Sequence, residues 1–88
     1  MKWKISYSKR AYKFIEKEKI EERVKEVITK FILKYKRGKN ISLDVKKMKG
    51  KWKRYYRIKI GKIRVILKVI EKSREIIVDT VDFRESVY

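Results

Sequence analysis

Three cationic side chains alternate with apolar residues in the segment RIKIGKIR, which spans residues 57–64. Alternate side chains of a strand point to the same face of a sheet, so Arg57 and Lys59 share one face. The Gly-Lys pair that follows is typical of a two-residue hairpin loop, and counting outward from this loop places Arg64 opposite Lys59. The chemistry available to such a cluster is anion binding, because guanidinium and ammonium groups pair with phosphate and carboxylate oxygens.

The predicted hairpin carries further cations on this face. Directly opposed like charges destabilise a sheet by roughly a few tenths of a kcal/mol, and a solvated outer face is the simplest interpretation of any single cation. The whole set favours a ligand, since Asp44 is the single acid between Val27 and Ile70, against sixteen lysines and arginines. We therefore interpret the hairpin as an anion-binding platform. Its outer face comprises Tyr55, Arg57, Lys59, Arg64, Ile66 and Lys68.

The elements that hold this platform follow from hydrophobic periodicity. Apolar residues recur every three or four positions in two segments, which predicts two helices, the first capped by Ser8 and the second ending at Gly38. The expected order is β-α-α-β-β-β, an α+β fold in which a helical hairpin packs on a mostly antiparallel sheet, as one compact domain over residues 1–88. The expected strands are Trp3–Ser8, Arg54–Ile60, Ile63–Ile70 and Glu75 to about Phe83, the expected helices are 9–18 and Ile20–Lys36, and Lys39–Lys51 is expected to be a polar connector.

Composition restricts the function further. Lysine and arginine number 28 against 11 acidic residues, a net charge of +17 that attracts nucleic acid, an anionic membrane surface or an acidic protein. No apolar run approaches the roughly 18 residues of a membrane span, and the N-terminus lacks a signal-peptide core, so we expect a cytoplasmic protein with no membrane partner. The sequence has no His and no Cys, which removes the usual zinc ligands and general base, and no metal or cofactor is expected.

Three segments match the motifs of a known family. They are YSKRA at Tyr7–Ala11, KKMKGKWKRYYRIKIGKIRVILKV at residues 46–69, and DFRESVY at residues 82–88. Together they resemble the RelE/ParE toxin superfamily, most closely its RelE branch, over essentially the whole chain. The resemblance implies a RelE-like fold and the toxin of a type II toxin–antitoxin pair. Phe83 stands where many relatives have His, and Leu67 where tyrosine is common.

The resemblance also implies an activity and a set of catalytic residues. RelE-type relatives are endoribonucleases that enter the ribosomal A site and cut mRNA there, without a metal ion. We expect the arginines to stabilise the phosphorane formed when the 2′-OH attacks. Lys59, packed among other cations, is expected to have a lowered pKa and to shuttle a proton, while Tyr88 stacks on a base or assists proton transfer. The residues matched to the family's catalytic set are Arg57, Lys59, Arg64, Arg84 and Tyr88.

The remaining positive charge is expected to contact RNA without doing chemistry. The lysines of the second helix are expected either to contact RNA as well or to be solvated on the outer face of that helix. The implied partners are a cognate acidic antitoxin, the ribosome with its mRNA, and operator DNA only through the antitoxin. The expected RNA-binding residues are Lys46, Lys47, Lys49, Lys51, Lys53, Tyr55 and Lys68, and the helix lysines are Lys30, Lys34 and Lys36.

Two other functions compete with this reading. A ParE-like inhibitor of DNA gyrase is the nearest by family, although the basic trio on the hairpin and the terminal tyrosine argue against it. A nucleic-acid-binding module without catalysis explains the charge of +17 equally well. A substitution that removes activity without weakening binding separates these classes. For Arg84 the structural alternative is a surface ion pair with Asp82 or Glu85, which is worth little.

Overall fold

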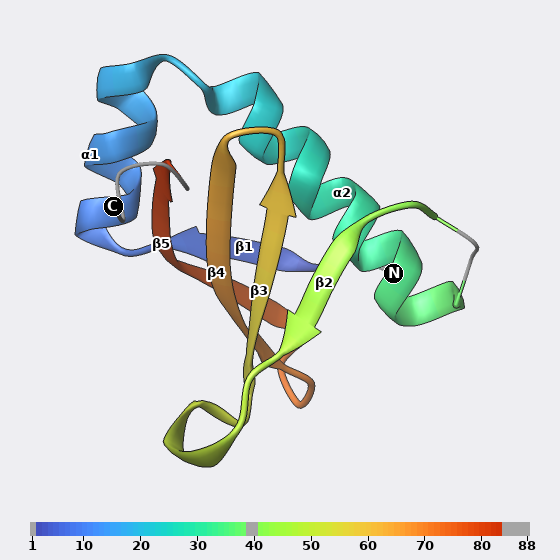
Figure 1. Ribbon diagram of the computed structural model, residues 1–88. Helices are drawn as coiled ribbons and strands as arrows, with labels where there is room; N and C mark the ends of the chain where they lie inside the picture. The colour runs from blue at the N-terminus through green and yellow to red at the C-terminus, as the bar shows by residue number, and fades with distance from the viewer. Residues whose placement is uncertain (1, 39–40, 84–88) are drawn as a thin grey trace.

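The computed structural model describes residues 2–38 and 41–83, which form two helices packed on a twisted five-stranded sheet (Figure 1). The predicted α+β architecture, a helical pair on a mostly antiparallel sheet, is confirmed. The spatial order of the strands is β1-β5-β4-β3-β2. The helices are α1 (Lys9–Glu18) and α2 (Glu21–Arg37), and the strands are β1 (Lys4–Tyr7), β2 (Asp44–Lys47), β3 (Tyr55–Ile60), β4 (Ile63–Ile70) and β5 (Glu75–Phe83).

The sheet has one strand more than the sequence predicted. Strand β2 lies within the segment expected to be a polar connector, and it pairs antiparallel with β3 at the edge of the sheet. Its sequence, DVKK, offers Val45 as its single apolar side chain, which packs against the core, while the other three side chains are exposed. An edge strand with so little apolar alternation carries almost no strand signal. A short 3₁₀ helix, Gly50–Trp52, follows in the connection to β3.

The central hairpin has the register that the sequence predicted. Ile60 pairs with Ile63 and Lys59 with Arg64, and the pairing continues to Tyr55 opposite Lys68. Gly61 begins the loop with a φ of 57°, a left-handed conformation in which glycine has no steric penalty, as the first residue of a tight hairpin loop requires. The cations of the hairpin therefore do share one face of the sheet.

Ser8 both begins α1 and ties it to β5. Its Oγ accepts a hydrogen bond from the backbone N–H of Ala11 at 3.1 Å, as predicted for an N-cap. The same hydroxyl donates to the carbonyl of Asp79 at 2.6 Å, and the Ser8 N–H donates to the carbonyl of Val78 at 2.8 Å. Helix α1 thus starts at a point fixed to the sheet. Neither described helix is long and apolar enough to cross a membrane.

Ser8→Ala is expected to lower the free energy of unfolding by about 1–2 kcal/mol, because it removes the N-cap and a hydrogen bond to β5 together. Urea denaturation followed by circular dichroism measures this loss. Ser42→Ala removes a hydroxyl from an exposed loop residue and is the matched control, with an expected change within about 0.5 kcal/mol. Equal effects of the two substitutions would contradict the capping role.

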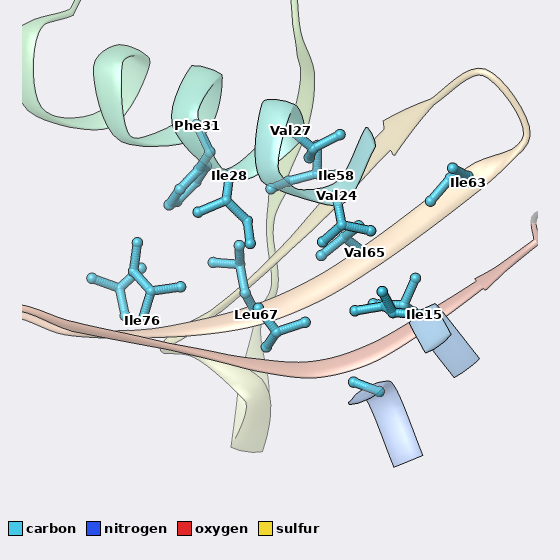
Figure 2. Packing of buried hydrophobic residues seen from close by; sticks show 14 residues of the cluster. Ile15, Val24, Val27, Ile28, Phe31, Ile58, Ile63, Val65, Leu67 and Ile76 are labelled. Carbon is cyan, nitrogen blue, oxygen red and sulfur yellow. The ribbon is translucent and has the colours of Figure 1, made fainter. Parts of the chain in front are cut away.

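The core lies between the helices and the inner face of the sheet (Figure 2). Figure 2 shows Phe31 and Ile28 pointing from α2 toward the sheet, where Leu67 meets them. Each such side chain contributes roughly 1.5–3 kcal/mol when it is fully buried. Because the helices cover the inner face, the charged side chains of the hairpin lie on the outer face of the sheet. The fully buried large side chains are Val24, Val27, Ile28, Phe31, Ile58, Ile63, Val65, Leu67, Ile76 and Val78.

Candidate functional site

The outer face of the sheet carries its charges in cross-strand rows. One row runs across four strands, with Lys59 and Arg64 in the middle and an aspartate at each end. The next row places Arg57 of β3 between Lys46 of β2 and Ile66 of β4. Three cations of the predicted platform, Arg57, Lys59 and Arg64, thus lie together at the centre of the face. The first row reads Asp44, Lys59, Arg64 and Asp82.

Arg64 forms a bidentate ion pair with Asp82. Its Nε donates to one carboxylate oxygen at 3.0 Å and its Nη2 to the other at 2.7 Å. The two side chains are 25% and 28% exposed, so water screens the pair only in part. These two hydrogen bonds fix the position and the orientation of the Arg64 guanidinium. The sequence reading missed the pair, because it considered Asp82 only as a partner for Arg84.

Flanking strands supply the acidic residues that the hairpin itself lacks. Asp82 comes from β5 on one side, and Asp44 from β2 pairs in register with Lys59 on the other. The repulsion between Lys59 and Arg64 is therefore offset within the sheet, and part of the cationic pattern has a structural explanation. Arg57 has no acid in its own row, where its register neighbours are Lys46 and Ile66.

Arg57 has an unsatisfied donor. Its Nε is buried and has no hydrogen-bond partner among the described residues, which include every neighbour on β2 and β4. A buried N–H group without an acceptor is unfavourable by about 1–3 kcal/mol. Because this atom is buried, an oxygen-rich anion over the second row would supply the missing acceptor only if the Arg57 side chain turned outward. Arg57 is therefore the member of the cluster that the fold leaves most in need of a ligand.

An aromatic group borders the cationic cluster. The rings of Trp52 and Tyr55 meet edge to face with centroids 4.8 Å apart, and Lys68 Nζ lies 5.8 Å from the centroid of Tyr55. Trp52 is 39% exposed. Tyr56, the neighbour of Tyr55 in the sequence, faces the other side of the sheet, and the centroid of its ring lies 5.3 Å from that of Phe31 in the core. Tyr55 thus belongs to the outer face, where a ring can stack on an unpaired base.

The lysines predicted to contact RNA do not form one surface. Lys46 and Lys68 lie on the outer face beside the cluster, while Lys49 and Lys51 are exposed in the connection between β2 and β3. Lys47 and Lys53 instead line a cavity beside Tyr56, on the side of the sheet that carries the helices. Arg84 and Tyr88 lie outside the described residues, so their catalytic roles stay predictions.

The three lysines of α2 have partners within the molecule. Lys30 Nζ lies 3.2 Å from a carboxylate oxygen of Glu26, one turn earlier. Lys34 donates to the carbonyl of Ile41 at 3.0 Å. Lys36 Nζ lies 5.4 Å from the centroid of the Trp3 ring. These contacts favour the structural explanation of the helix lysines over a role in binding RNA.

The described residues contain no group of three or more acidic side chains that could hold a metal ion. What the outer face offers is positive charge at fixed positions. Among the described residues Arg57 has an unsatisfied donor and Arg64 is oriented by a carboxylate, while Lys59 is adjacent to both, two residues from Arg57 on β3 and in register with Arg64. This arrangement fits a phosphodiester, whose oxygens accept several charged hydrogen bonds at once.

Comparison with known proteins gives relatives by structure alone. No protein-family model and no curated protein sequence matches the chain. The toxin–antitoxin complex RelB-RelE from Methanococcus jannaschii matches with 29% identity and a TM-score of 0.64, over 94% of both chains. The archaeal RelE-RelB complex from Pyrococcus horikoshii OT3 matches with 25% identity and a TM-score of 0.69, over 96% of this chain and 97% of that one.

A third solved structure extends the likeness of fold to bacteria. A mutant toxin from Helicobacter pylori matches with 17% identity and a TM-score of 0.67, over 99% of this chain and 100% of that one. At this identity the match concerns the fold. All three similarities span nearly the whole length of each protein, so the likeness concerns the whole fold and not one element of it.

Proposed function

Because the chain belongs to the RelE-like toxin superfamily, we propose that it is the toxin of a type II toxin–antitoxin pair that cleaves mRNA in the ribosomal A site. The observation that carries the proposal is the cluster of Arg57, Lys59 and Arg64 on the outer face, in which the Arg57 Nε has no acceptor among the described residues. A scissile phosphate would supply that acceptor to an Arg57 side chain that turns outward. Its charge also relieves the repulsion among the three cations.

The proposed reaction is attack of the ribose 2′-oxygen on the neighbouring phosphate. The bond from phosphorus to the 5′-oxygen breaks, and a 2′,3′-cyclic phosphate and a free 5′-hydroxyl form. The phosphorane carries two negative charges, which Arg57 and Arg64 stabilise from fixed positions and Arg84 from the C-terminal segment. Lys59 and Tyr88 are the proposed proton carriers for the 2′-OH and for the leaving oxygen. Positive side chains do the charge stabilisation, so the proposal needs no metal ion.

In this proposal the ribosome positions the mRNA for attack by its 2′-oxygen. A 2′-oxygen attacks efficiently only when it lies in line with the bond that breaks, and ordered mRNA in the A site reaches this arrangement more often than free RNA. The exposed cations Lys46, Lys49 and Lys51 supply affinity for ribosomal RNA and mRNA. Tyr55 stacks on a base next to the cleavage site.

An acidic antitoxin and a cytoplasmic location complete the proposal. Two of the similar structures are complexes of a RelE toxin with a RelB antitoxin. A net charge of +17 would favour an antitoxin segment rich in Asp and Glu. Contact with operator DNA would pass through this antitoxin.

The test is a translation reaction with purified ribosomes and a defined mRNA, in which primer extension maps new 5′ ends. We expect cuts within the A-site codon in the presence of ribosomes and intact mRNA in their absence. Intact mRNA in every lane, with protein that circular dichroism shows to be folded, would remove the nuclease proposal. Inhibition of DNA gyrase by the same preparation would then support the ParE-like alternative, and RNA binding without either activity would support the binding module.

Asp82→Asn is expected to change RNA affinity and cleavage in opposite directions. Removing one negative charge beside the proposed phosphate site raises affinity, by up to about fivefold. Loss of the ionic clamp on Arg64 lets the guanidinium turn away, and the single-turnover cleavage rate falls by about tenfold or more. Affinity is measured with an mRNA that carries 2′-deoxyribose at the cleavage position, and the rate with the normal mRNA.

Asp79→Asn is the matched control for this pair. Asp79 lies on the same strand and pairs at 3.1 Å with Arg10 of α1, so its substitution makes the same charge change away from the cluster. We expect neither RNA affinity nor the cleavage rate to change by more than about twofold. If both aspartate variants lower the rate equally, Asp82 has no special role in positioning Arg64.

A further inference from the structure

A cavity of about 370 Å³ opens at the end of the sheet remote from the Gly61 turn. Its lining comes from the last turns of α2, from β2 and its connection to β3, and from the end of β4 with the turn to β5. The connection and the turn lie at the lower end of Figure 1. Tyr35, Tyr56 and Val69 form its wall and are partly or fully buried. Four exposed cations, Lys47, Lys53, Arg54 and Lys72, surround the opening.

The wall of the cavity is held in place by aromatic packing. The rings of Tyr35 and Tyr56 lie edge to face with centroids 5.7 Å apart, and both contact Phe31 of the core. The Tyr35 hydroxyl donates a hydrogen bond to a carboxylate oxygen of Glu71. Burial, and next the bond to Glu71, raise the pKa of Tyr35 well above its ordinary value, so this hydroxyl stays protonated and neutral.

The charge around the cavity is strongly positive. Glu71 is the single acid among the described residues that line it, and its carboxylate already accepts the hydrogen bond from Tyr35. Against it stand four cations contributed by three different segments of the chain, which leaves a net charge of +3 for the lining. Cations drawn from separate segments to one opening repel each other, and an anion between them removes the repulsion.

This cavity is distinct from the cluster on the outer face. Lys46 and Lys47 are neighbours on β2, and alternation along the strand sends them to opposite faces. Lys46 lies in register with Arg57, whereas Lys47 lies in register with Tyr56 and lines the cavity. An anion in the cavity therefore contacts none of Arg57, Lys59 and Arg64.

We propose that this cavity binds a nucleotide phosphate, with the cations of the rim on the phosphate and the tyrosine and valine wall against the ribose or base. The volume lies in the range of small-ligand sites. An aromatic and aliphatic wall next to a cationic rim matches a molecule that is apolar at one end and anionic at the other. A free nucleotide and a terminal nucleotide of an RNA strand share this chemistry, and the test separates the two sources.

Isothermal titration calorimetry with ADP, and separately with a short oligoribonucleotide, is carried out on the whole chain in low salt. Three proteins are compared: wild type, Lys47→Gln and Lys13→Gln. The two variants make the same charge change at exposed positions, one at the cavity and the other on α1, outside both the cavity and the outer-face cluster. Methyl chemical shifts of Val69 and Ile70 report on the cavity, and those of Ile66 report on the outer face.

We expect ADP to shift the Val69 and Ile70 methyls, and Lys47→Gln to weaken the ADP binding that these shifts report about tenfold while Lys13→Gln leaves it unchanged. Binding of the oligoribonucleotide alone, with the same dependence on Lys47, supports the site and identifies the strand as its source. Equal weakening by the two variants, shifts confined to Ile66, or no binding of either probe overturns the proposal. No ribosome is present, so these outcomes are independent of the proposed nuclease activity.

Discussion

Arg64→Ala is expected to slow mRNA cleavage on the ribosome by about 100- to 1,000-fold, because a positioned donor to the charge that develops in the transition state is lost. Affinity for the ribosome is expected to fall far less, since it rests on many exposed cations and each contributes little by itself. Single-turnover primer extension gives the rate, and a binding assay with the 2′-deoxy mRNA gives the affinity. A large loss of rate with a small loss of affinity separates an enzyme from a binding module.

The substitution leaves Asp82 without its bidentate partner, so stability has to be measured beside activity. An unpaired carboxylate that is 28% exposed destabilises the sheet moderately. Arg64→Ala combined with Asp82→Asn removes this charge, and we expect the double variant to regain stability without regaining activity. Arg23→Ala, at an exposed arginine in the helix layer, makes the same charge change as Arg64→Ala and is expected to keep the full cleavage rate. An Arg64→Ala protein that keeps more than a tenth of the rate would contradict the assignment.

Phe31→Ala is expected to lower the free energy of unfolding by about 4 kcal/mol. Phe31 is 2% exposed and stacks on Tyr35 at a centroid distance of 5.6 Å, so alanine leaves a cavity beneath α2 that its neighbours fill only in part. A domain of this size is stable by a margin of roughly 5–10 kcal/mol, and the variant is expected to unfold at a much lower urea concentration.

Tyr12→Ala is the control for the core substitution. Tyr12 is an aromatic residue of a helix that remains 56% exposed, so its truncation is expected to change stability by less than about 1 kcal/mol. Urea titrations of both variants, followed by tryptophan fluorescence and circular dichroism, give the comparison. Equal losses would show that α2 does not pack as Figure 2 shows it.

Local periodicity determined most of what the sequence could predict about this fold. Both helices, the cap at Ser8, the Gly61 turn and the full register of β3 with β4 depend on neighbours within a few residues of each other. Strand β2 was missed because one valine gives no alternation. The parallel pairing of β1 with β5 joins the two ends of the described chain, and no local pattern reports such a contact.

The partner of Arg64 was hidden by an irregularity in β5. Counting back from the turn between β4 and β5 pairs Ile70 with Glu75 and would bring Val81 opposite Arg64. The ladder instead shifts by one residue between Ile66 and Leu67, so Asp79 has no register partner on β4. That shift turns Val81 into the core, where it is 4% exposed, and turns Asp82 onto the outer face. A bulge of this kind changes which side chains share a face, and its mark in the sequence is the step of three from Val78 to Val81 where a regular strand has a step of two.

The cavity on the helix side could not be predicted from the sequence, for a related reason. Lys47 and Lys53 were grouped with Lys46 because all three lie in one basic stretch, although the alternation along β2 separates Lys47 from Lys46. That alternation could not be used while β2 was taken for a connector. Arg54 and Lys72 join the cavity from positions that lie far apart in the chain.

The position of β5 in the sheet also determines when the protein can finish folding during its synthesis. Strand β1 is made first, yet its parallel partner is β5, and Ser6 reaches Glu75 across 69 positions of sequence. Translation adds on the order of 5–20 residues per second, so the first strand waits several seconds for its partner to emerge from the exit tunnel. Strand β5 also brings Asp82 to Arg64. A nascent chain therefore completes neither its sheet nor its charged row before β5 is released, and the ribosome that makes it carries an unfinished site until then.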